Sequence, residues 1–353
     1  MSGPQRPSRS SSPTTSVLFV TAGDQRRATG GNVYAAHALA ALRHAGAAVR
    51  TLSLDRTPSV AALRTLRAEI VIVDTIAAAK ATPIVRVLRR RGARVVTLAL
   101  MSRGAVRLAR GSDDVIAVSR TLGKELRAAG IPASRIAVIP PGTSRAAKAR
   151  ARRVRGSRTG QPARVLCVAN WTRAKGIHTL IAAARRVPEV SLDLVGAHPD
   201  PRYASQVLAQ IAHADLAGRI RVRGALTGAR LDQLHGSADI FALPSTLESY
   251  GMAVGEALAR GLPVVACDIA ATREVTAGAA ALVPPGRVRP LTRTLRSIAT
   301  DARRRHALAA RARQRARTLP TWERTERKLA SAVLRAVSAR GAGARRTRAG
   351  RPS

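Results

Sequence analysis

Residues 241–268 constrain the fold of this chain more than any other stretch, because they read as a strand, a loop, a helix and a second strand. An apolar run stops at Pro244, and after a polar loop Gly251 leads into a helical pattern. Gly261 ends that pattern as a residue just beyond a helix commonly does. The apolar residues 264–267 then predict the next buried strand. An open parallel sheet uses such a unit to bind phosphorylated ligands beyond the carboxyl ends of its strands.

The helix in this stretch begins where an anion could bind. Its first turn, at Gly251 and Met252, offers unpaired backbone N–H groups and a partial positive charge. Gly251 has no Cβ, so a ligand can approach the backbone closely. Two carboxylates flank this point, Glu248 in the loop and Glu256 about a turn and a half into the helix. They cannot share one helical face, and we therefore expect them to contact different parts of one ligand.

Glu248 and Glu256, with seven residues between them and followed by ALARGLPVVA, resemble the E-x7-E signature of retaining nucleotide-sugar glycosyltransferases of family 4. That family has the GT-B fold. The resemblance implies that Glu248 lies against the donor sugar, that the next backbone amides hold the diphosphate, and that Glu256 binds the ribose. The donor-binding residues that it implies between them are Ser249, Tyr250, Gly251 and Met252. The alternative is an ordinary surface pair of glutamates beside a Rossmann-like helix.

A second motif lies in the loop after the apolar strand that begins at residue 163. The sequence NWTRAKGI at 170–177 resembles the donor-phosphate loop of the same family, and Lys175 and Gly176 match its Lys-Gly pair. A helix dipole disfavours a cation at a helix start, which makes this lysine unusual unless an anion binds there. We therefore expect Lys175 to bind the diphosphate and to act as a catalytic residue together with Glu248.

The chain also departs from the family pattern. The family's earlier arginine is missing, Asn170 occupies its place, and Arg173 is the candidate that would restore the charge. The family commonly has a histidine after the fourth strand of its first domain. This chain has LALMSRG at 98–104 instead, and no histidine between His44 and His178. The sugar-side contact of the first domain is therefore in doubt.

The first half of the chain alternates strands and helices, which predicts a parallel sheet. Gly30 and Gly31 precede the first helix, where the family often carries a glycine pair near the donor diphosphate or the acceptor. A loop that needs only glycine flexibility would look the same. Ser119 is the expected N-cap of a helix that ends at Gly130.

The fold class predicted for the chain is α/β of the GT-B type, with two Rossmann-like domains facing a cleft. A single Arg-rich helix is expected over 291–317, and Trp322 opens a last helix that returns to pack on the first domain. The predicted organisation is a disordered tail (1–16), an N-terminal acceptor domain (17–142), a basic linker (143–162), a C-terminal nucleotide-sugar donor domain (163–318), a C-terminal crossover helix (319–337) and a disordered basic tail (338–353).

The composition of the chain bears on its binding partners and on its localisation. Lys and Arg number 61 against 20 Asp and Glu, for a net charge of +41. Such a charge attracts nucleic acid or an anionic membrane surface, although we favour a composition biased toward Ala and Arg, with incidental affinity for anionic surfaces, as its explanation. Aromatic residues are only 2%, so we expect no specific nucleic acid, since single-strand binders use aromatic stacking. No apolar run reaches the ~20 residues that span a bilayer. We expect a cytoplasmic protein, with peripheral association at the inner face of the membrane as the variant that the charge allows.

The resemblance implies a metal-independent, retaining transfer of a hexose from a GDP- or UDP-linked donor to an unidentified acceptor, which could be a sugar, a lipid or a small molecule. The nucleotide sugar is a co-substrate, and no cofactor or metal is expected, because the chain has no Asp-x-Asp pair and no Cys/His cluster. The alternative is a catalytically degenerate GT-B protein that binds anionic membrane or nucleic-acid surfaces. A nucleotide-sugar epimerase of the same fold is a third reading, disfavoured because its extra histidine and acidic residues are not found.

Overall fold

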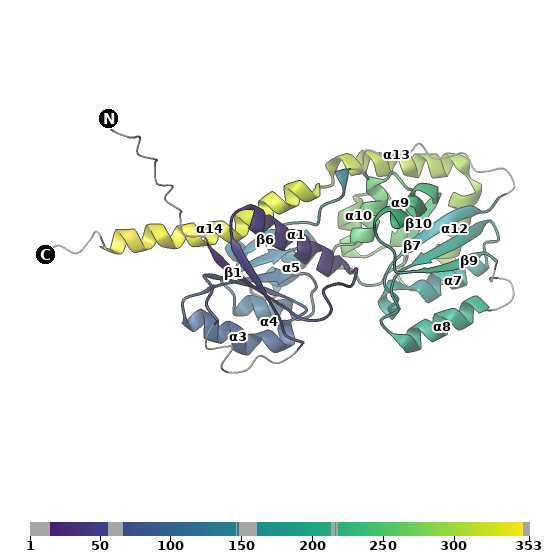
Figure 1. Cartoon of the computed structure of the whole chain (residues 1–353). Helices are drawn as coiled ribbons and strands as arrows, with labels where there is room; N and C mark the ends of the chain where they lie inside the picture. Colours follow the sequence, from purple (N-terminus) through teal and green to yellow (C-terminus); the bar gives the residue numbers. More distant parts are fainter. Residues whose placement is uncertain are drawn as a thin grey trace, which may run out of the picture.

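The computed structural model describes residues 15–55, 66–145, 147, 161–212, 216 and 218–348, and it shows two α/β lobes joined side by side (Figure 1). Most of the predicted N-terminal tail and of the basic linker lies outside the described residues. Residue 16, predicted to belong to that tail, is the first residue of a strand.

The first lobe is built on a parallel sheet of six strands in the order β2-β1-β3-β4-β5-β6. Its strands are β1 (Ser16–Thr21), β2 (Ala48–Ser53), β3 (Ile70–Asp74), β4 (Arg94–Ala99), β5 (Asp114–Ala117) and β6 (Ile136–Val138). Its helices are α1 (Gly30–His44), α3 (Ala78–Arg90), α4 (Ala105–Arg110), α5 (Arg120–Ala128) and the 3-10 turn η1 (Ala133–Arg135). β3 is buried at every position, as expected of a central strand covered by helices on both faces.

The second lobe repeats this architecture around the order β12-β11-β10-β7-β8-β9. Its strands are β7 (Ala163–Val168), β8 (Val190–Val195), β9 (Ile220–Gly224), β10 (Ile240–Leu243), β11 (Val264–Cys267) and β12 (Ala281–Val283). Its helices are η2 (Arg173–Lys175), α7 (Ile177–Arg185), α8 (Pro201–Ala212), α9 (Gly228–Ser237), α10 (Met252–Ala259), α11 (Ala270–Thr276), α12 (Val288–Thr300) and α13 (Ala302–Thr318). The GT-B fold with two Rossmann-like lobes is confirmed.

The strand order of the second lobe creates a topological switch point. From β7 the chain moves outward to β8 and β9, and it then returns to β10 on the other side of β7. β7 and β10 are therefore neighbours from which the connections leave in opposite directions. A crevice opens outside the carboxyl ends of the strands at such a topological switch point. The loops that follow β7 and β10 carry the two motifs singled out in the sequence.

Two helices replace the single helix predicted over 291–317. α12 ends at Thr300 and α13 begins at Ala302, because Asp301 turns extended and caps the second helix. Its Oδ1 accepts a hydrogen bond of 3.0 Å from the backbone N–H of Arg304. Asp is among the residues that best cap a helix N-terminus, so this break is visible in the sequence as an Asp inside an Arg/Ala-rich run.

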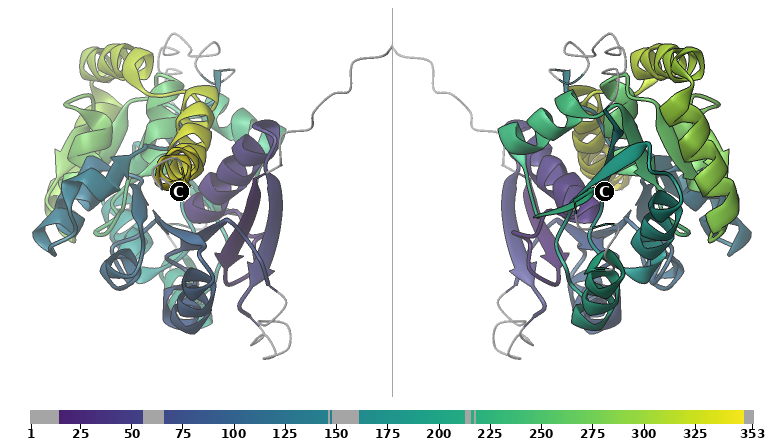
Figure 2. Two further views of the ribbon diagram at one scale, coloured as in Figure 1. Left: turned by 90° about the vertical axis from the view of Figure 1, so that its left-hand side faces the viewer. Right: turned by 90° about the vertical axis from the view of Figure 1, so that its right-hand side faces the viewer.

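The last helix crosses from the second lobe to the first. α14 runs from Trp322 to Arg348, beyond the predicted end at 337, and its Ala- and Arg-rich continuation corrects the predicted disordered tail over 338–348. It lies beside α1 (Figure 2). The Trp322 indole stacks on the His37 imidazole with centroids 3.6 Å apart, and His37 Nδ1 lies 2.6 Å from a Glu326 carboxylate oxygen. Trp322 therefore acts as a packing anchor.

The crossover needs a residue without a side chain at position 142, which is the glycine of the Pro141-Gly142 pair. A Cβ on Gly142 would lie 2.3 Å from the backbone nitrogen of Trp322. The next residue, Thr143, pairs with Thr321 in a β-bridge. The two segments that join the lobes therefore run in direct backbone contact.

A carboxylate of the second lobe caps a helix of the first. Ser119 is the N-cap of α5, as predicted, and its Oγ accepts from the N–H of Leu122 at 3.0 Å. Glu274 of α11 reaches the same helix end across the lobe boundary. Its two carboxylate oxygens accept from the backbone N–H groups of Arg120 at 2.7 Å and Thr121 at 2.8 Å. The capping carboxylate also matches the positive end of the helix dipole.

Replacing Glu274 with Gln is expected to lower the free energy of unfolding by about 1–2 kcal/mol, because the cap loses its charge and one acceptor oxygen. Urea denaturation measures this loss. Asp268→Asn is the matched control, because it removes one negative charge from the same lobe, where Asp268 pairs with the exposed Arg273. An exposed pair of this kind contributes little to the free energy of unfolding. Equal losses in both variants would contradict a cap between the lobes.

Candidate nucleotide-sugar site

The loops after β7 and β10 are held together by backbone contacts. Thr246 N–H donates to the Ala174 carbonyl at 2.7 Å, and the Ser245 hydroxyl donates to the same oxygen at 3.1 Å. Gly176 lies where a Cβ would be 2.3 Å from the Pro244 carbonyl oxygen, and its φ of +68° favours glycine. The two loops therefore form one rigid floor at the switch point.

Lys175 and Glu248 meet on this floor. The lysine Nζ lies 2.7 Å from Glu248 Oε1, although 73 positions separate the two residues in the chain. The side chains are 28% and 10% exposed, so the pair is largely shielded and the lysine is its more exposed member. The structure thus brings together the two residues predicted to be catalytic. A lysine has three donors, so it can keep this partner and still bind an anion.

The N-terminus of α10 lies next to this pair in the chain. Gly251 precedes the helix with φ +95°, and no side chain caps the N–H groups of the first turn. Met252 is half-buried. Ser249 is half-buried too, but Tyr250 is buried, and burial raises the pKa of its hydroxyl to about 12. Because its side chain is buried, Tyr250 is expected to contribute its backbone, and not its hydroxyl, to donor binding.

Glu256 has a different environment from that of Glu248. Among the described residues no hydrogen bond or ion pair to its carboxylate is found, and burial is the main cause that raises its pKa. The nearby Arg260 binds Asp232 and the backbone carbonyl of Glu256 instead. A shielded carboxylate with free acceptor capacity is suited to bind hydroxyl groups.

Asn170 and Arg173 lie apart although they belong to one loop. Asn170 Oδ1 accepts from Ala197 N–H at 3.0 Å, and its Nδ2 donates at 3.4 Å to the carbonyl of Ala28 in the first lobe. Asn170 therefore stays at the boundary between the lobes. The Arg173 guanidinium instead donates to Gln206 of α8 at 3.0 Å. It does not join Lys175, and its predicted part in donor binding stays a prediction.

The glycine pair of the first lobe faces the second. A Cβ on Gly30 would lie 3.1 Å from Met252 Sδ, so the start of α1 is in contact with the start of α10. A Cβ on Gly31 would lie 3.4 Å from Leu100 Cδ1. Leu100 belongs to the segment after β4 in which the family commonly has a histidine, and its apolar side chain lies beside Gly31. Met101, next in the chain, is 39% exposed.

Glu274 and the carbonyl of Ala28 are contacts between the lobes that sequence reasoning did not assign. Nothing in the local sequence distinguishes Glu274 from a surface glutamate, since the helix that it caps lies in the other lobe. Within the described ranges no group of three or more His, Cys, Asp or Glu side chains is placed to hold a metal ion, and no helix is long and apolar enough to cross a bilayer.

Comparisons with known proteins give a family match and several relatives. The family described as Glycosyl transferases group 1 matches residues 149–315. A D-inositol 3-phosphate glycosyltransferase of Xylanimonas cellulosilytica is 30% identical over 185 residues, which are 49% of this chain and 44% of that protein. A phosphatidyl-myo-inositol mannosyltransferase of Mycolicibacterium smegmatis is 33% identical over 148 residues, 40% of this chain and 37% of the relative. The matches thus span less than half of the curated relatives.

Solved structures share the whole fold. Sucrose-phosphate synthase from Thermosynechococcus elongatus superposes with a TM-score of 0.77 at 19% identity, over 92% of this chain and 100% of that chain. Anabaena HepE in complex with UDP and glucose gives a TM-score of 0.71 at 19% identity, over 89% and 98%. At this identity the likeness concerns the GT-B fold.

Proposed function

Because residues 149–315 match the family described as Glycosyl transferases group 1, we propose that the chain is a retaining hexosyltransferase that uses a nucleoside diphosphate sugar. The donor is GDP- or UDP-linked, and the acceptor is a sugar, a lipid or a small molecule. The observation that carries the proposal is the contact between Lys175 and Glu248 at the switch point of the second lobe. A cation and a carboxylate side by side suit a ligand that joins a diphosphate to a sugar.

Each part of the donor has a matching group. The uncapped N–H groups at the start of α10 and the Lys175 ammonium suit the diphosphate. Glu248 suits the sugar hydroxyls, and Glu256, with its free acceptor oxygens, suits the ribose diol. The structural neighbour from Anabaena binds UDP and glucose, which supports a uridine donor as the first to test.

The proposed chemistry is a displacement on one face of the sugar. The bond between the anomeric carbon and the phosphate oxygen breaks, and a bond to the acceptor oxygen forms on the same face. The acceptor proton passes to the departing phosphate oxygen, and the negative charge grows on the diphosphate. Lys175 and the α10 amides stabilise that charge in place of a metal, and such electrostatic stabilisation is usually the largest catalytic term.

The test is a thermal-shift titration with UDP, GDP, ADP and their sugars. A ligand that binds only the folded protein at about 100 times its Kd stabilises it by about 2.7 kcal/mol. One nucleotide is expected to raise the Tm of the wild type, and Glu256→Ala is expected to lose most of this shift. Glu125→Ala in the first lobe, whose carboxylate binds Ser102, is the control that keeps it.

If no nucleotide raises the Tm at millimolar concentration, the donor site does not function and the proposal is wrong. The degenerate GT-B binder then becomes the better account. The segment 98–104 after β4, where the family commonly has a histidine, is the observation in its favour, because it contains no imidazole.

A further inference from the structure

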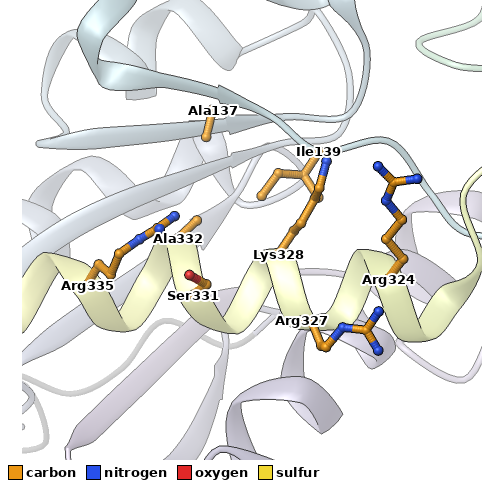
Figure 3. A pocket seen from close by; sticks show the side chains of 8 residues that line it. All are labelled: Ala137, Ile139, Arg324, Arg327, Lys328, Ser331, Ala332 and Arg335. Atoms are coloured by element: carbon orange, nitrogen blue, oxygen red, sulfur yellow. The ribbon is translucent and has the colours of Figure 1, made fainter.

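A groove with a basic rim lies between β6 and α14, in the first lobe (Figure 3). Its volume is about 560 Å³. The lining residues are Ala137, Ile139, Arg324, Arg327, Lys328, Ser331, Ala332 and Arg335. The groove is not part of the donor site, because none of the residues proposed to bind the donor lines it.

The four basic side chains of this groove are exposed, and no hydrogen bond or ion pair of theirs is found within the part of the chain that the structure describes. The acids of α14 in that part are engaged elsewhere. Glu323 lies 3.4 Å from Arg145, and Glu326 binds His37. Among the described residues Glu323 also interacts electrostatically with Arg327. No carboxylate lines the groove, which carries four positive charges.

The cations form a line rather than a cage. Three of the four cations, Arg324, Lys328 and Arg335, lie with Ser331 at the spacing of four, three and four residues that keeps side chains on one helix face. Arg327 lies beside this row. At 1.5 Å per residue this row is about 16 Å long. A single phosphate would engage one or two of these side chains at a time. The row matches several anionic groups arranged in a plane.

The floor of the groove is apolar. Ala137 and Ile139 come from the β6 segment, at the free edge of the first sheet, and Ala332 comes from α14 (Figure 3). Single-stranded nucleic acid is held by aromatic stacking as well as by cations, and no aromatic side chain lines this groove. Cations above an apolar floor suit a phospholipid, whose phosphate is followed by glycerol and acyl carbons.

We propose that the groove between β6 and α14 is the docking site of the protein on an anionic lipid bilayer. Lys and Arg rows on a helix recognise anionic headgroups by charge, and the attraction falls off within a Debye length. The site holds the first lobe against the surface and does not involve the donor-binding residues of the second lobe. The proposal does not depend on the transferase activity.

The test is co-sedimentation of the full chain with vesicles of phosphatidylcholine and phosphatidylglycerol in equal parts, at about 0.1 M salt. The variant replaces Arg324, Arg327, Lys328 and Arg335 with Gln. Each Lys or Arg near such a surface strengthens binding about fivefold, so the quadruple variant is expected to bind about 600-fold more weakly. Vesicles of phosphatidylcholine alone are expected to bind neither protein.

The net charge of +41 makes a matched control essential. The control variant replaces four exposed arginines of α12 and α13 with Gln: Arg293, Arg303, Arg311 and Arg317. It loses the same four charges and is expected to weaken vesicle binding less than about fivefold. A third variant, with Lys at 324, 327 and 335, keeps the charges and is expected to bind as the wild type does.

Equal losses in the two Gln variants would assign vesicle binding to the overall charge and overturn the proposal. Unchanged binding of the α14 variant would overturn it as well. If that variant keeps vesicle binding but loses binding to a DNA oligonucleotide, the groove is a nucleic-acid site and the proposal is wrong. Circular dichroism and the Tm of each variant confirm that the fold is retained, as expected for exposed positions.

Discussion

Replacing Lys175 with Met is expected to weaken nucleoside diphosphate binding about 10- to 150-fold. The expectation follows because a hydrogen bond to a charged group contributes about 1.5–3 kcal/mol. Sugar transfer is expected to fall about 100- to 1000-fold, as when one donor to a developing oxyanion is removed. Titration calorimetry measures the binding, and nucleotide release from the donor sugar measures the turnover.

The matched control comes from the same loop. Arg173→Met also removes one positive charge, but the Arg173 guanidinium binds Gln206 and lies 5.8 Å from the centre of the Tyr203 ring. A change of less than about threefold in affinity is expected, as for a screened surface charge. If Arg173→Met weakens binding as much as Lys175→Met does, the diphosphate is attracted by the general charge of the loop.

Glu248→Gln tests whether Glu248 acts on the sugar and Lys175 on the diphosphate. It removes the negative charge beside the diphosphate, so nucleotide affinity is expected to be kept or to rise. Because Glu248 lies 2.7 Å from Lys175, the double variant with Lys175→Met is expected to deviate from the sum of the single effects. Strict additivity would mean that the two side chains act on the donor separately.

Gly176→Ala is expected to lower the free energy of unfolding by about 2–5 kcal/mol. A positive φ costs an alanine about 1–2 kcal/mol, and the overlap adds about 1–3 kcal/mol, because the new Cβ would lie 2.3 Å from the Pro244 carbonyl oxygen. Relief of this overlap requires the loops after β7 and β10 to separate. Nucleotide affinity is therefore expected to fall as well, since Lys175 is the neighbouring residue.

Gly278→Ala isolates the contribution of the backbone angle. Gly278 has φ +83°, and nothing lies within 4 Å of a Cβ placed there. This variant is expected to lose only about 1–2 kcal/mol and to keep its nucleotide affinity. Urea denaturation followed by tryptophan fluorescence compares the two. Equal losses of unfolding free energy in the two variants would show that the loops after β7 and β10 separate at no energetic cost. Their contact would then not hold the site.

Much of the local structure could be predicted from particular residues. Ser119 and Gly130 bound a helix correctly, since an N-cap hydroxyl and a left-handed glycine act within one turn of the chain. Lys175 was singled out because a cation at a helix start is unusual without an anion nearby, and Gly251 because a residue without a Cβ lets a ligand approach the backbone. Asp301 was missed as a helix break, although its capping chemistry is local and was available.

Sequence reasoning did not predict the side-chain contacts made with residues that are distant in the chain. The direction of the Arg173 side chain depends on Gln206 of another helix, and the capping role of Glu274 depends on α5 of the other lobe. The basic row on α14 becomes a groove only because β6 lies beside it. Periodicity and capping rules contain no information on these neighbours.

The sequence by itself determined the α/β rhythm, the two lobes, and the residues whose chemistry suits a nucleotide sugar, because these depend on contacts within a few residues of chain. Only the tertiary structure decided the strand order that places Lys175 against Glu248 across 73 positions. It also decided the return of α14 to the first lobe. The physical reason is that side-chain packing over the whole sheet selects which distant segments meet.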